Sequence, residues 1–132
     1  GATYTIVDAG IEDELKDLSA EEKSAFRSEL GAKDDGINEL IKKAYDLLGL
    51  ETFFTTGEAE TRAWTIQKNS TAPVAGAAIH NDFKDRFIRA DIVAYEKFVE
   101  AGSYAVCREK GYLRTEGKEY IVKDGDVIEF KV

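Results

Sequence analysis

The sequence is poor in the residues that build disulfide frameworks and metal centres. Its 132 residues contain one cysteine, Cys107, and one histidine, His80. A single cysteine excludes an intrachain disulfide, which fits a reducing cytoplasm. A single histidine excludes a zinc site built on a pair of histidines. The sequence therefore predicts neither a disulfide scaffold nor a metal centre.

Two further absences concern membranes and nucleotides. The longest uncharged stretch, residues 69–81, is only moderately apolar and too short to span a bilayer, and no secretory signal is visible at the start. The chain has no Gly-x-x-x-x-Gly-Lys-Ser/Thr loop and no Gly-x-Gly-x-x-Gly motif. Without a phosphate cradle and its lysine, a protein cannot position a nucleoside triphosphate for attack. We therefore predict a cytoplasmic chain without membrane partners that does not itself hydrolyse ATP or GTP.

The charge of the chain is acidic and unevenly spread. The net charge is −8, of which residues 1–49 carry −6 and residues 50–132 carry −2. The sign reverses to +3 within residues 62–89. A local basic surface on an acidic protein suggests a site for an anionic partner. Judged on charge alone, an ordinary solvent-exposed surface without a partner is the favoured interpretation.

The first 49 residues show mainly helical patterns. Residues 3–7 are rich in β-branched and aromatic side chains and predict a short strand. The capping box Ser19-Ala-Glu-Glu22 predicts a helix from Ala20 that buries Phe26 and Leu30 and ends at Gly31. Apolar residues at helical spacing over 37–48 predict the most secure helix of the chain.

From residue 50 the pattern alternates between strands and helices. A helix is expected from Pro73 through small residues toward Phe83, and short helices over 95–102 and 103–110. Strands are expected over 53–56, 62–67, 87–93, 113–115, 118–122 and 127–132, with the first two joined as a hairpin and a turn at 116–117. A small mixed sheet crossed by one principal helix is the ubiquitin-like β-grasp arrangement, so the fold class is α+β.

Several strings, from about residue 37 to the end, resemble the YchF family of Obg-like ATPases, which are P-loop NTPases that end in a β-grasp module called the TGS domain. The matching strings are Lys43-Ala-Tyr-Asp-Leu-Leu-Gly-Leu50, Arg62-Ala-Trp-Thr-Ile66, Ile79-His-Asn-Asp-Phe83, Phe87-Ile-Arg-Ala90, Glu116-Gly-Lys-Glu-Tyr120 and Lys123-Asp-Gly-Asp126. The resemblance implies a C-terminal fragment. Residues 1–49 would be the last strand and helices of the nucleotide-binding domain, and residues 50–132 the TGS domain.

The resemblance also implies what the parent protein does. The parent would hydrolyse ATP or GTP with magnesium, whereas this fragment would hold no cofactor. The family usually carries a Ser/Cys-Ala-Lys loop that touches the base, and the matching positions here are Asp8, Ala9 and Gly10, of which only the alanine agrees. The expected role of the fragment is recognition of the ribosome, through RNA or a ribosomal protein.

The candidate contacts are the cations of the basic segment and the histidine within it. We expect weak, salt-sensitive RNA binding and no DNA binding. A ubiquitin-like protein-binding module is the first alternative, and a regulatory nucleotide-sensing domain is the second. The candidate residues are Arg62, Lys68, His80, Lys84, Arg86 and Arg89.

The remaining distinctive side chains have structural interpretations beside functional ones. His80 is expected to cap the C-terminal end of a helix, with a phosphate contact as the alternative. Trp64 is expected in the core rather than as a platform for bases. Phe83 and Phe87 suit either the core or stacking on single-stranded RNA. Cys107 is expected to pack in a helix rather than act as a nucleophile.

Overall fold

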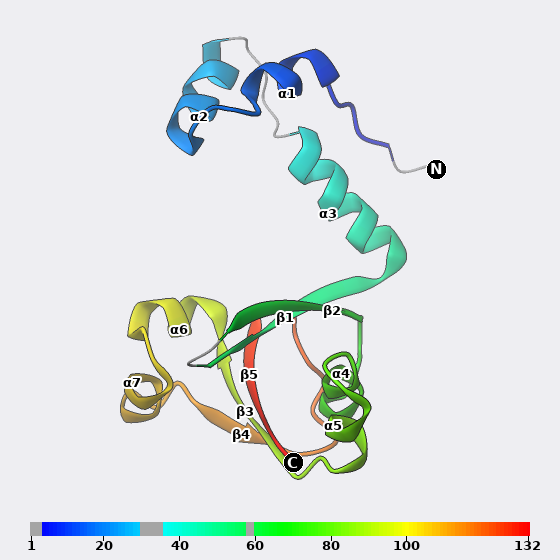
Figure 1. Cartoon of the computed structure of the whole chain (residues 1–132), viewed down its shortest axis with the longest axis vertical. Coiled ribbons are helices and arrows are strands. Elements are labelled where there is room, and N and C mark those ends of the chain that lie inside the picture. Colours follow the sequence, from blue (N-terminus) through cyan, green and yellow to red (C-terminus); the bar gives the residue numbers. More distant parts are fainter. Residues whose placement is uncertain (1–3, 30–35, 58–59) are drawn as a thin grey trace. The chain divides into compact units, whose positions relative to one another are not determined.

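The protein was analysed as a computed structural model that describes residues 4–29, 36–57 and 60–132 (Figure 1). The chain divides into two compact units, Gly1–Leu48 and Gly49–Val132. We refer to them as the front unit and the sheet unit and describe each by itself. No helix within the described ranges combines the length and the apolarity needed to cross a membrane.

In its described residues, the front unit forms the helices α1 (Ala9–Leu15), α2 (Ala20–Glu29) and α3 (Gly36–Leu48). The predicted capping box at the start of α2 is confirmed. The Ser19 backbone N–H donates to Glu22 Oε2 at 2.8 Å, and the Glu22 N–H donates to Ser19 Oγ at 3.3 Å. These bonds satisfy donors that the first helical turn leaves without partners, and they lower the pKa of Glu22.

The prediction of a strand over residues 3–7 is wrong where it can be checked, in residues 4–7. Residues 4–8 have no regular secondary structure, and Tyr4 and Ile6 are 78% and 81% exposed. A β-branched segment becomes a strand only when another strand accepts its backbone hydrogen bonds, and the described part of the front unit offers none. Of the residues expected to be buried in α2, Phe26 is half-buried, while Leu30 and the predicted stop at Gly31 lie outside the described residues.

The sheet unit is built on five strands, β1 (Leu50–Thr56), β2 (Thr61–Gln67), β3 (Arg89–Ala94), β4 (Arg114–Glu116) and β5 (Asp126–Lys131). Their order across the sheet is β2-β1-β5-β3-β4. The central pair β1 and β5 is parallel, and the other pairs are antiparallel. This arrangement confirms the predicted α+β class and the β-grasp sheet.

The strand register assigns side chains to the two faces of the sheet. Ile92 of β3 lies opposite Ile128 of β5, and both belong with Phe53 to the buried core. Val127 lies opposite Phe54 on one side and Val93 on the other. Because side chains alternate along a strand, the set of Phe54, Val127 and Val93 occupies the opposite face.

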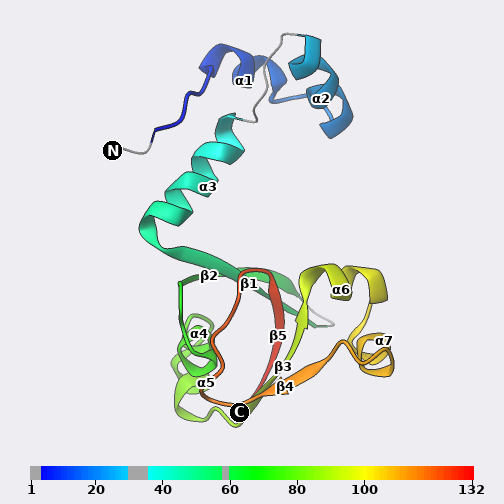
Figure 2. The same cartoon turned by 180° about the vertical axis from the view of Figure 1, so that it is seen from behind.

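The core face is covered by α4 (Ala72–Ala77) and α5 (Asn81–Asp85), seen beside the sheet in Figures 1 and 2. The small residues of α4 allow the close approach that the sequence predicts. A Cβ atom added at Gly76 would lie 3.0 Å from Phe83 Cβ and 3.3 Å from the ring of Phe130. Any larger residue at this position would therefore push the helix away from the sheet.

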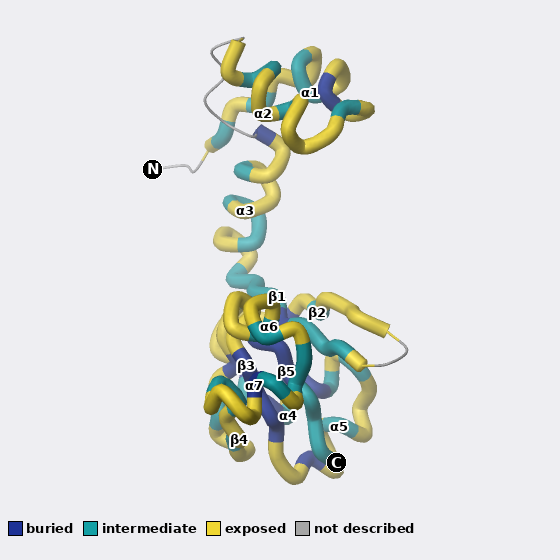
Figure 3. The backbone as a smooth tube through the Cα atoms, turned by 90° about the vertical axis from the view of Figure 1, so that its left-hand side faces the viewer, coloured by how far each residue is buried: buried dark blue, intermediate teal, exposed yellow. Residues whose placement is uncertain are grey.

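The second face is covered in part by α6 (Tyr95–Ala101) and α7 (Tyr104–Glu109). The ring of Tyr95 lies 5.6 Å from that of Phe54, and Val93 and Val127 are almost fully buried. Figure 3 shows the buried residues concentrated in the strands of this unit, whereas α1 and α2 of the front unit are largely exposed. The sheet unit thus has helices on both faces.

Two predicted elements of this unit differ from the structure. The single helix expected toward Phe83 is broken into α4 and α5, because the chain becomes extended at His80. The strand expected over 118–122 is absent, apart from one bridge between Thr71 and Ile121. The turn at 116–117 therefore joins no hairpin, and β4 pairs with β3 instead. The second difference comes from pairing partners that lie far away in the sequence.

Candidate functional site

Three of the predicted contact residues gather where α5 leads into β3. Lys84 lies in the last turn of α5, Arg86 is its C-terminal capping residue, and Arg89 opens β3. All three are exposed. None of them forms an ion pair with any residue that the structure describes. We call these residues the junction cations, and the exposed carboxylates of Asp82 and Asp85 lie in the same segment without pairing with them.

The backbone that carries the junction cations is anchored by aromatic packing. The rings of Phe83 and Phe87 lie 5.9 Å and 6.3 Å from the ring of Phe130, both in edge-to-face geometry. Such pairs stabilise by about 0.5–1.5 kcal/mol beyond the area that they bury. These aromatic residues therefore belong to the core and hold the junction in place, which disfavours their use as stacking platforms for bases.

An apolar side chain stands among the junction cations. Ile88 is 63% exposed, although its backbone N–H donates to the carbonyl of Lys131 at 2.9 Å. Val132 is also 44% exposed. Lys131 lies directly opposite Arg89 and is paired with Glu129. The junction thus offers positive charge next to exposed apolar surface, a combination that suits a phosphate backbone or an acidic protein.

The structure places Arg62 and Lys68 elsewhere. Both belong to β2 and the turn after it, and β1 and β5 lie between β2 and β3 in the sheet. Arg62 covers the ring of Trp64 at 4.3 Å and lies 3.8 Å from Glu60. Trp64 packs against the core, as expected, and its Nε1 donates to Thr55 Oγ1 at 2.9 Å. The six predicted residues therefore do not form a single patch.

Lys68 acts electrostatically on a partly buried carboxylate of β1. Burial and the nearby Asp124 raise the pKa of Glu51, and Lys68 opposes this rise. Glu51 Oε1 is buried and has no hydrogen-bond partner within the described part of the chain. This carboxylate is consequently a local cost to stability rather than a built binding site.

His80 occupies the opposite end of a helix from the one expected. It is the N-terminal capping residue of α5, and its Nδ1 accepts the backbone N–H of Asp82 at 3.3 Å. The expected C-terminal cap is wrong because the helix breaks before this residue. The His80 side chain is 68% exposed and remains near the start of the junction.

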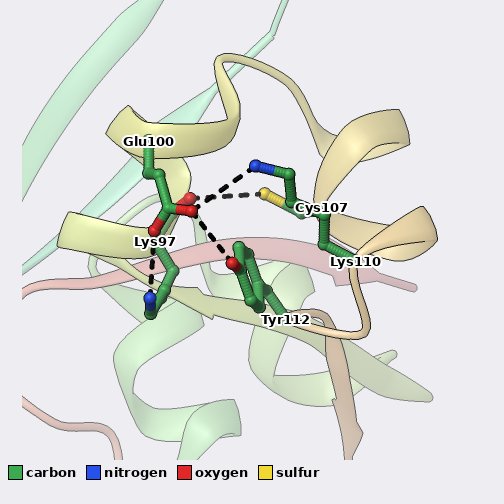
Figure 4. Close-up of polar contacts among 5 residues, drawn as sticks. All are labelled: Lys97, Glu100, Cys107, Lys110 and Tyr112. Atoms are coloured by element: carbon green, nitrogen blue, oxygen red, sulfur yellow. Dashed lines mark hydrogen bonds and ion pairs between the residues drawn. The ribbon is translucent and has the colours of Figure 1, made fainter.

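A group of polar side chains ties α6 to α7 (Figure 4). Glu100 accepts hydrogen bonds from Lys97 at 2.9 Å, from Tyr112 at 2.9 Å and from Lys110 at 3.4 Å. The bonds from Lys97 and Tyr112 lower the pKa of Glu100 to about 2. The helical spacing of Lys97 and Glu100 is a signal that could have been found in the sequence. The arrangement is a structural clamp at the surface.

Cys107 lies beneath this clamp and has no exposed surface. Its Sγ lies 3.9 Å from the carbonyl oxygen of Lys97. It belongs to α7 on the second face of the sheet, whereas His80 belongs to α5 on the core face. Within the described ranges, no group of three or more His, Cys, Asp or Glu residues could hold a metal ion. Cys107 is thus a packing residue, as expected.

A buried carboxylate organises the chain between β4 and β5. Asp126 is 3% exposed and accepts the Tyr120 hydroxyl at 2.7 Å and the Lys123 backbone N–H at 2.9 Å. Arg114 lies 3.9 Å from its second oxygen. Burial, followed by the bond to Asp126, raises the pKa of Tyr120 to about 12. This network fixes the irregular segment where a strand was expected.

In the front unit, the residues that align with the base-contacting loop are used as a helix cap. Asp8 Oδ1 accepts the backbone N–H groups of Gly10 at 3.0 Å and of Ile11 at 3.1 Å. Glu12 of α1 pairs with Arg27 of α2 at 3.1 Å. These bonds connect the first two helices and account for the local structure around Asp8 without a ligand.

Comparison with known proteins identifies the family. Residues 50–132 match the family YchF-GTPase_C, which is described as a protein of unknown function (DUF933). The chain belongs to this family. It is 50% identical over 130 residues to the "Ribosome-binding ATPase YchF" of Bacillus subtilis, covering 98% of this chain and 36% of that protein. It is 44% identical over 131 residues to "Obg-like ATPase 1" of Gallus gallus, covering 99% of this chain and 33% of that protein.

A solved structure extends the family match to three dimensions. The "Structure of the Schizosaccharomyces pombe YchF GTPase" aligns with a TM-score of 0.77 and 34% identity, covering 91% of this chain and 32% of that one. The chain thus spans about a third of the length of the YchF and Obg-like relatives that it matches. The predicted resemblance to the YchF family is confirmed.

Proposed function

We propose that the sheet unit is the TGS recognition module of a cytoplasmic, ribosome-associated NTPase, and that the junction cations contact RNA. The observation that carries this proposal is the cluster of Lys84, Arg86 and Arg89, which are exposed and form no ion pair within the described chain. Three cations on one short segment of an acidic protein form a local positive surface to which phosphate groups can bind. The printed name of the Bacillus relative supports a ribosomal partner.

The geometry favours contact with the backbone of RNA rather than with its bases. Phe83 and Phe87 pack in the core, and Trp64 is covered by Arg62, so the aromatic residues near the cations do not offer free faces. Phosphate contacts position a protein but carry no sequence information. We therefore expect weak binding, on the order of 10–100 µM at physiological salt, with little preference for sequence. DNA is not the expected partner, and a ribosomal protein would supply additional contacts.

The parent protein is proposed to hydrolyse ATP or GTP with magnesium. The name of the Bacillus relative contains the word ATPase, and that of the Schizosaccharomyces structure contains the word GTPase. This chain has no phosphate-binding loop, so we propose that it neither holds nucleotide nor catalyses hydrolysis. Calorimetric titration with each nucleotide and magnesium should show no binding. A stoichiometric site of micromolar affinity would contradict this part of the proposal.

The alternative of a ubiquitin-like protein-binding face receives less support. The sheet face that such a module would use is covered over β3 and β5 by α6 and α7, where Val93 and Val127 are almost fully buried. No specific contact of the sheet unit favours a regulatory nucleotide within the described residues. Recognition through the junction is therefore the function that the geometry supports best.

Co-sedimentation with purified ribosomes at several salt concentrations tests the role of the junction cations. The variant K84A/R86A/R89A should bind more weakly, and its log–log salt slope should fall by up to about 3 if all three residues meet phosphates. The control variant K42A/R108A/K123A removes the same charge from other exposed positions and should keep the slope. Equal binding by a folded junction variant and the wild type would contradict the proposal.

A further inference from the structure

The strand β2 forms one edge of the sheet, and of the features that usually protect an edge it carries a single charge on the core-facing side, Arg62. It is seven residues long, and neither β2 nor its immediate flanks contain a proline. Its only charged residue is Arg62, whose guanidinium lies over Trp64. Natural edge strands are commonly blunted by bulges, prolines or inward-pointing charges, because an edge can pair with another strand. This edge is open to such pairing.

The hydrogen bonds at the two ends of β2 show which backbone groups point outward. The Gly57 N–H donates to the Glu60 carbonyl at 3.0 Å, and the Lys68 N–H donates to the Gly49 carbonyl at 2.7 Å. In an antiparallel pair, residues alternate between those that bond to the partner strand and those that point away. The even-numbered residues from 60 to 68 therefore face β1, and the backbone groups of the odd-numbered residues from 61 to 67 point away from it.

The sequence of this edge is complementary to itself about Trp64. In an antiparallel pair of two copies centred on this residue, Glu60 of each copy lies opposite Lys68 of the other. Thr61 then meets Gln67, and Ala63 meets Thr65. Opposite charges across an antiparallel pair stabilise it, and like charges destabilise it. The arrangement gives two pairs of opposite charge and no pair of like charge.

Neighbouring registers lack this complementarity. Only the odd-numbered residues have outward backbone groups, so odd residues of one copy must pair with odd residues of the other. The two-fold axis must therefore pass through a residue, and the neighbouring registers place it at Ala63 or Thr65. Centring on Thr65 brings Arg62 opposite Lys68, which are like charges. Centring on Ala63 brings Glu60 opposite Ile66 and leaves its charge without a cross-strand partner on the other copy. The charges therefore select the register centred on Trp64.

The selected register also brings the aromatic rings together. The even-numbered residues form the closely spaced pairs of the new ladder, in which side chains of the two strands lie nearest to each other. Trp64 of one copy would lie opposite Trp64 of the other at the two-fold axis. Aromatic pairs are among the cross-strand contacts that stabilise antiparallel sheets. Trp64 is half-buried, and the Arg62 guanidinium that lies over its ring must move aside for this contact.

We propose that β2 is a self-association edge, which pairs antiparallel with β2 of a second copy about a two-fold axis at Trp64. The two five-stranded sheets then form one continuous sheet across the dimer. An interface made mainly by one strand from each copy is small, and the acidic chains repel one another at long range. The dimer is consequently weak, with a dissociation constant on the order of 100 µM.

Sedimentation equilibrium of the whole chain, at about 0.15 M salt to screen long-range repulsion, tests the proposal. Wild type should show a concentration-dependent dimer. The substitution A63P removes an outward N–H without touching a bond to β1 and should abolish the dimer. K68E places like charges opposite each other twice and should weaken the dimer about tenfold. The double variant E60K/K68E exchanges the charges and should restore the affinity.

Two controls keep the outcome unambiguous. K118E changes the net charge as much as K68E does, but at an exposed position outside β2, and it should leave the dimer unchanged. Circular dichroism of the aromatic bands should change on dimerisation, because the only tryptophan lies on the axis.

A dimer that survives A63P, or charge reversals that do not rescue each other, would overturn the proposal. A chain that stays monomeric at millimolar concentration would also overturn it, and would leave the edge to a strand of another protein.

Discussion

The two units of this chain use apolar residues in opposite ways. In the sheet unit, apolar side chains from four strands, helix α4 and the segments that connect these elements meet in one core, with Phe53, Ile92 and Ile128 almost fully buried. In the front unit, Leu15 is the one large apolar side chain that is fully buried among the described residues. The stripe of α3 has the regular spacing of a core-facing helix, yet Leu40, Ile41 and Leu47 are about half to three-quarters exposed. An amphipathic pattern therefore shows which side of a helix can be buried, but burial itself needs a partner surface.

The largest expected difference comes from removing one large apolar side chain in each unit, buried in the sheet unit and exposed in the front unit. F53A leaves a cavity in the sheet unit and should lower the free energy of unfolding by about 3–5 kcal/mol. L47A removes a side chain that is 78% exposed and should change it by less than about 0.5 kcal/mol. Urea denaturation followed by Trp64 fluorescence measures the stability of the sheet unit. A similar loss in the two variants would show that the front unit buries its stripe in solution.

The next effect compares carboxylates in the two units. D126N weakens the buried bonds to Tyr120 and Lys123 and should cost about 1.5–3 kcal/mol. D13N removes an exposed ion pair to Lys16 and should cost at most about 0.5 kcal/mol. Thermal unfolding of both variants tests the difference. If D126N were as stable as the wild type, the network around the β4–β5 connection would have no structural role.

The boundary between the units can be tested by truncation. We propose that residues 50–132 fold alone, because their core is complete, and that their free energy of unfolding stays within about 1 kcal/mol of that of the whole chain. Residues 1–49 alone should show no cooperative transition, since they bury little apolar surface. A truncated sheet unit that does not unfold cooperatively would move the boundary or make the two units interdependent.

The smallest effect concerns the partly buried carboxylate of Glu51. Burial raises its pKa above that of the unfolded chain, so the ionised form is disfavoured in the folded state. Its contribution to stability is present at low pH and is lost as the pH rises through the folded pKa. E51Q should therefore stabilise the protein at pH 7 by roughly 0.5 kcal/mol or less, and this gain should vanish below about pH 4.

The exposed Glu14 of the front unit provides the matched control for this prediction. E14Q should leave the free energy of unfolding unchanged at both pH values, because its carboxylate is solvated in the folded state as well. Urea titrations at pH 4 and pH 7 measure both variants. A destabilisation by E51Q at pH 7 would mean that the carboxylate makes favourable contacts that outweigh its burial.

Part of the candidate site was visible in the sequence. Lys84, Arg86 and Arg89 were expected as exposed cations, and because they are close in sequence they stay close in space. Arg62 and Lys68 were included because they carry the same charge, but sheet order separates β2 from β3 by two strands. The exposure of Ile88 beside the cations had no signal in the sequence, because alternation within a strand does not show which end of it lies at the edge of the core.

Local interactions determined what the sequence alone could predict. The capping box at Ser19 and Glu22, the proline at the start of α4 and the hairpin of β1 and β2 all depend on residues a few positions apart. The tertiary structure decided the rest. Residues 4–8 lack a strand partner among the described residues, and β4 pairs with β3. Backbone hydrogen bonds and burial there depend on segments distant in sequence, and the local pattern does not specify those partners.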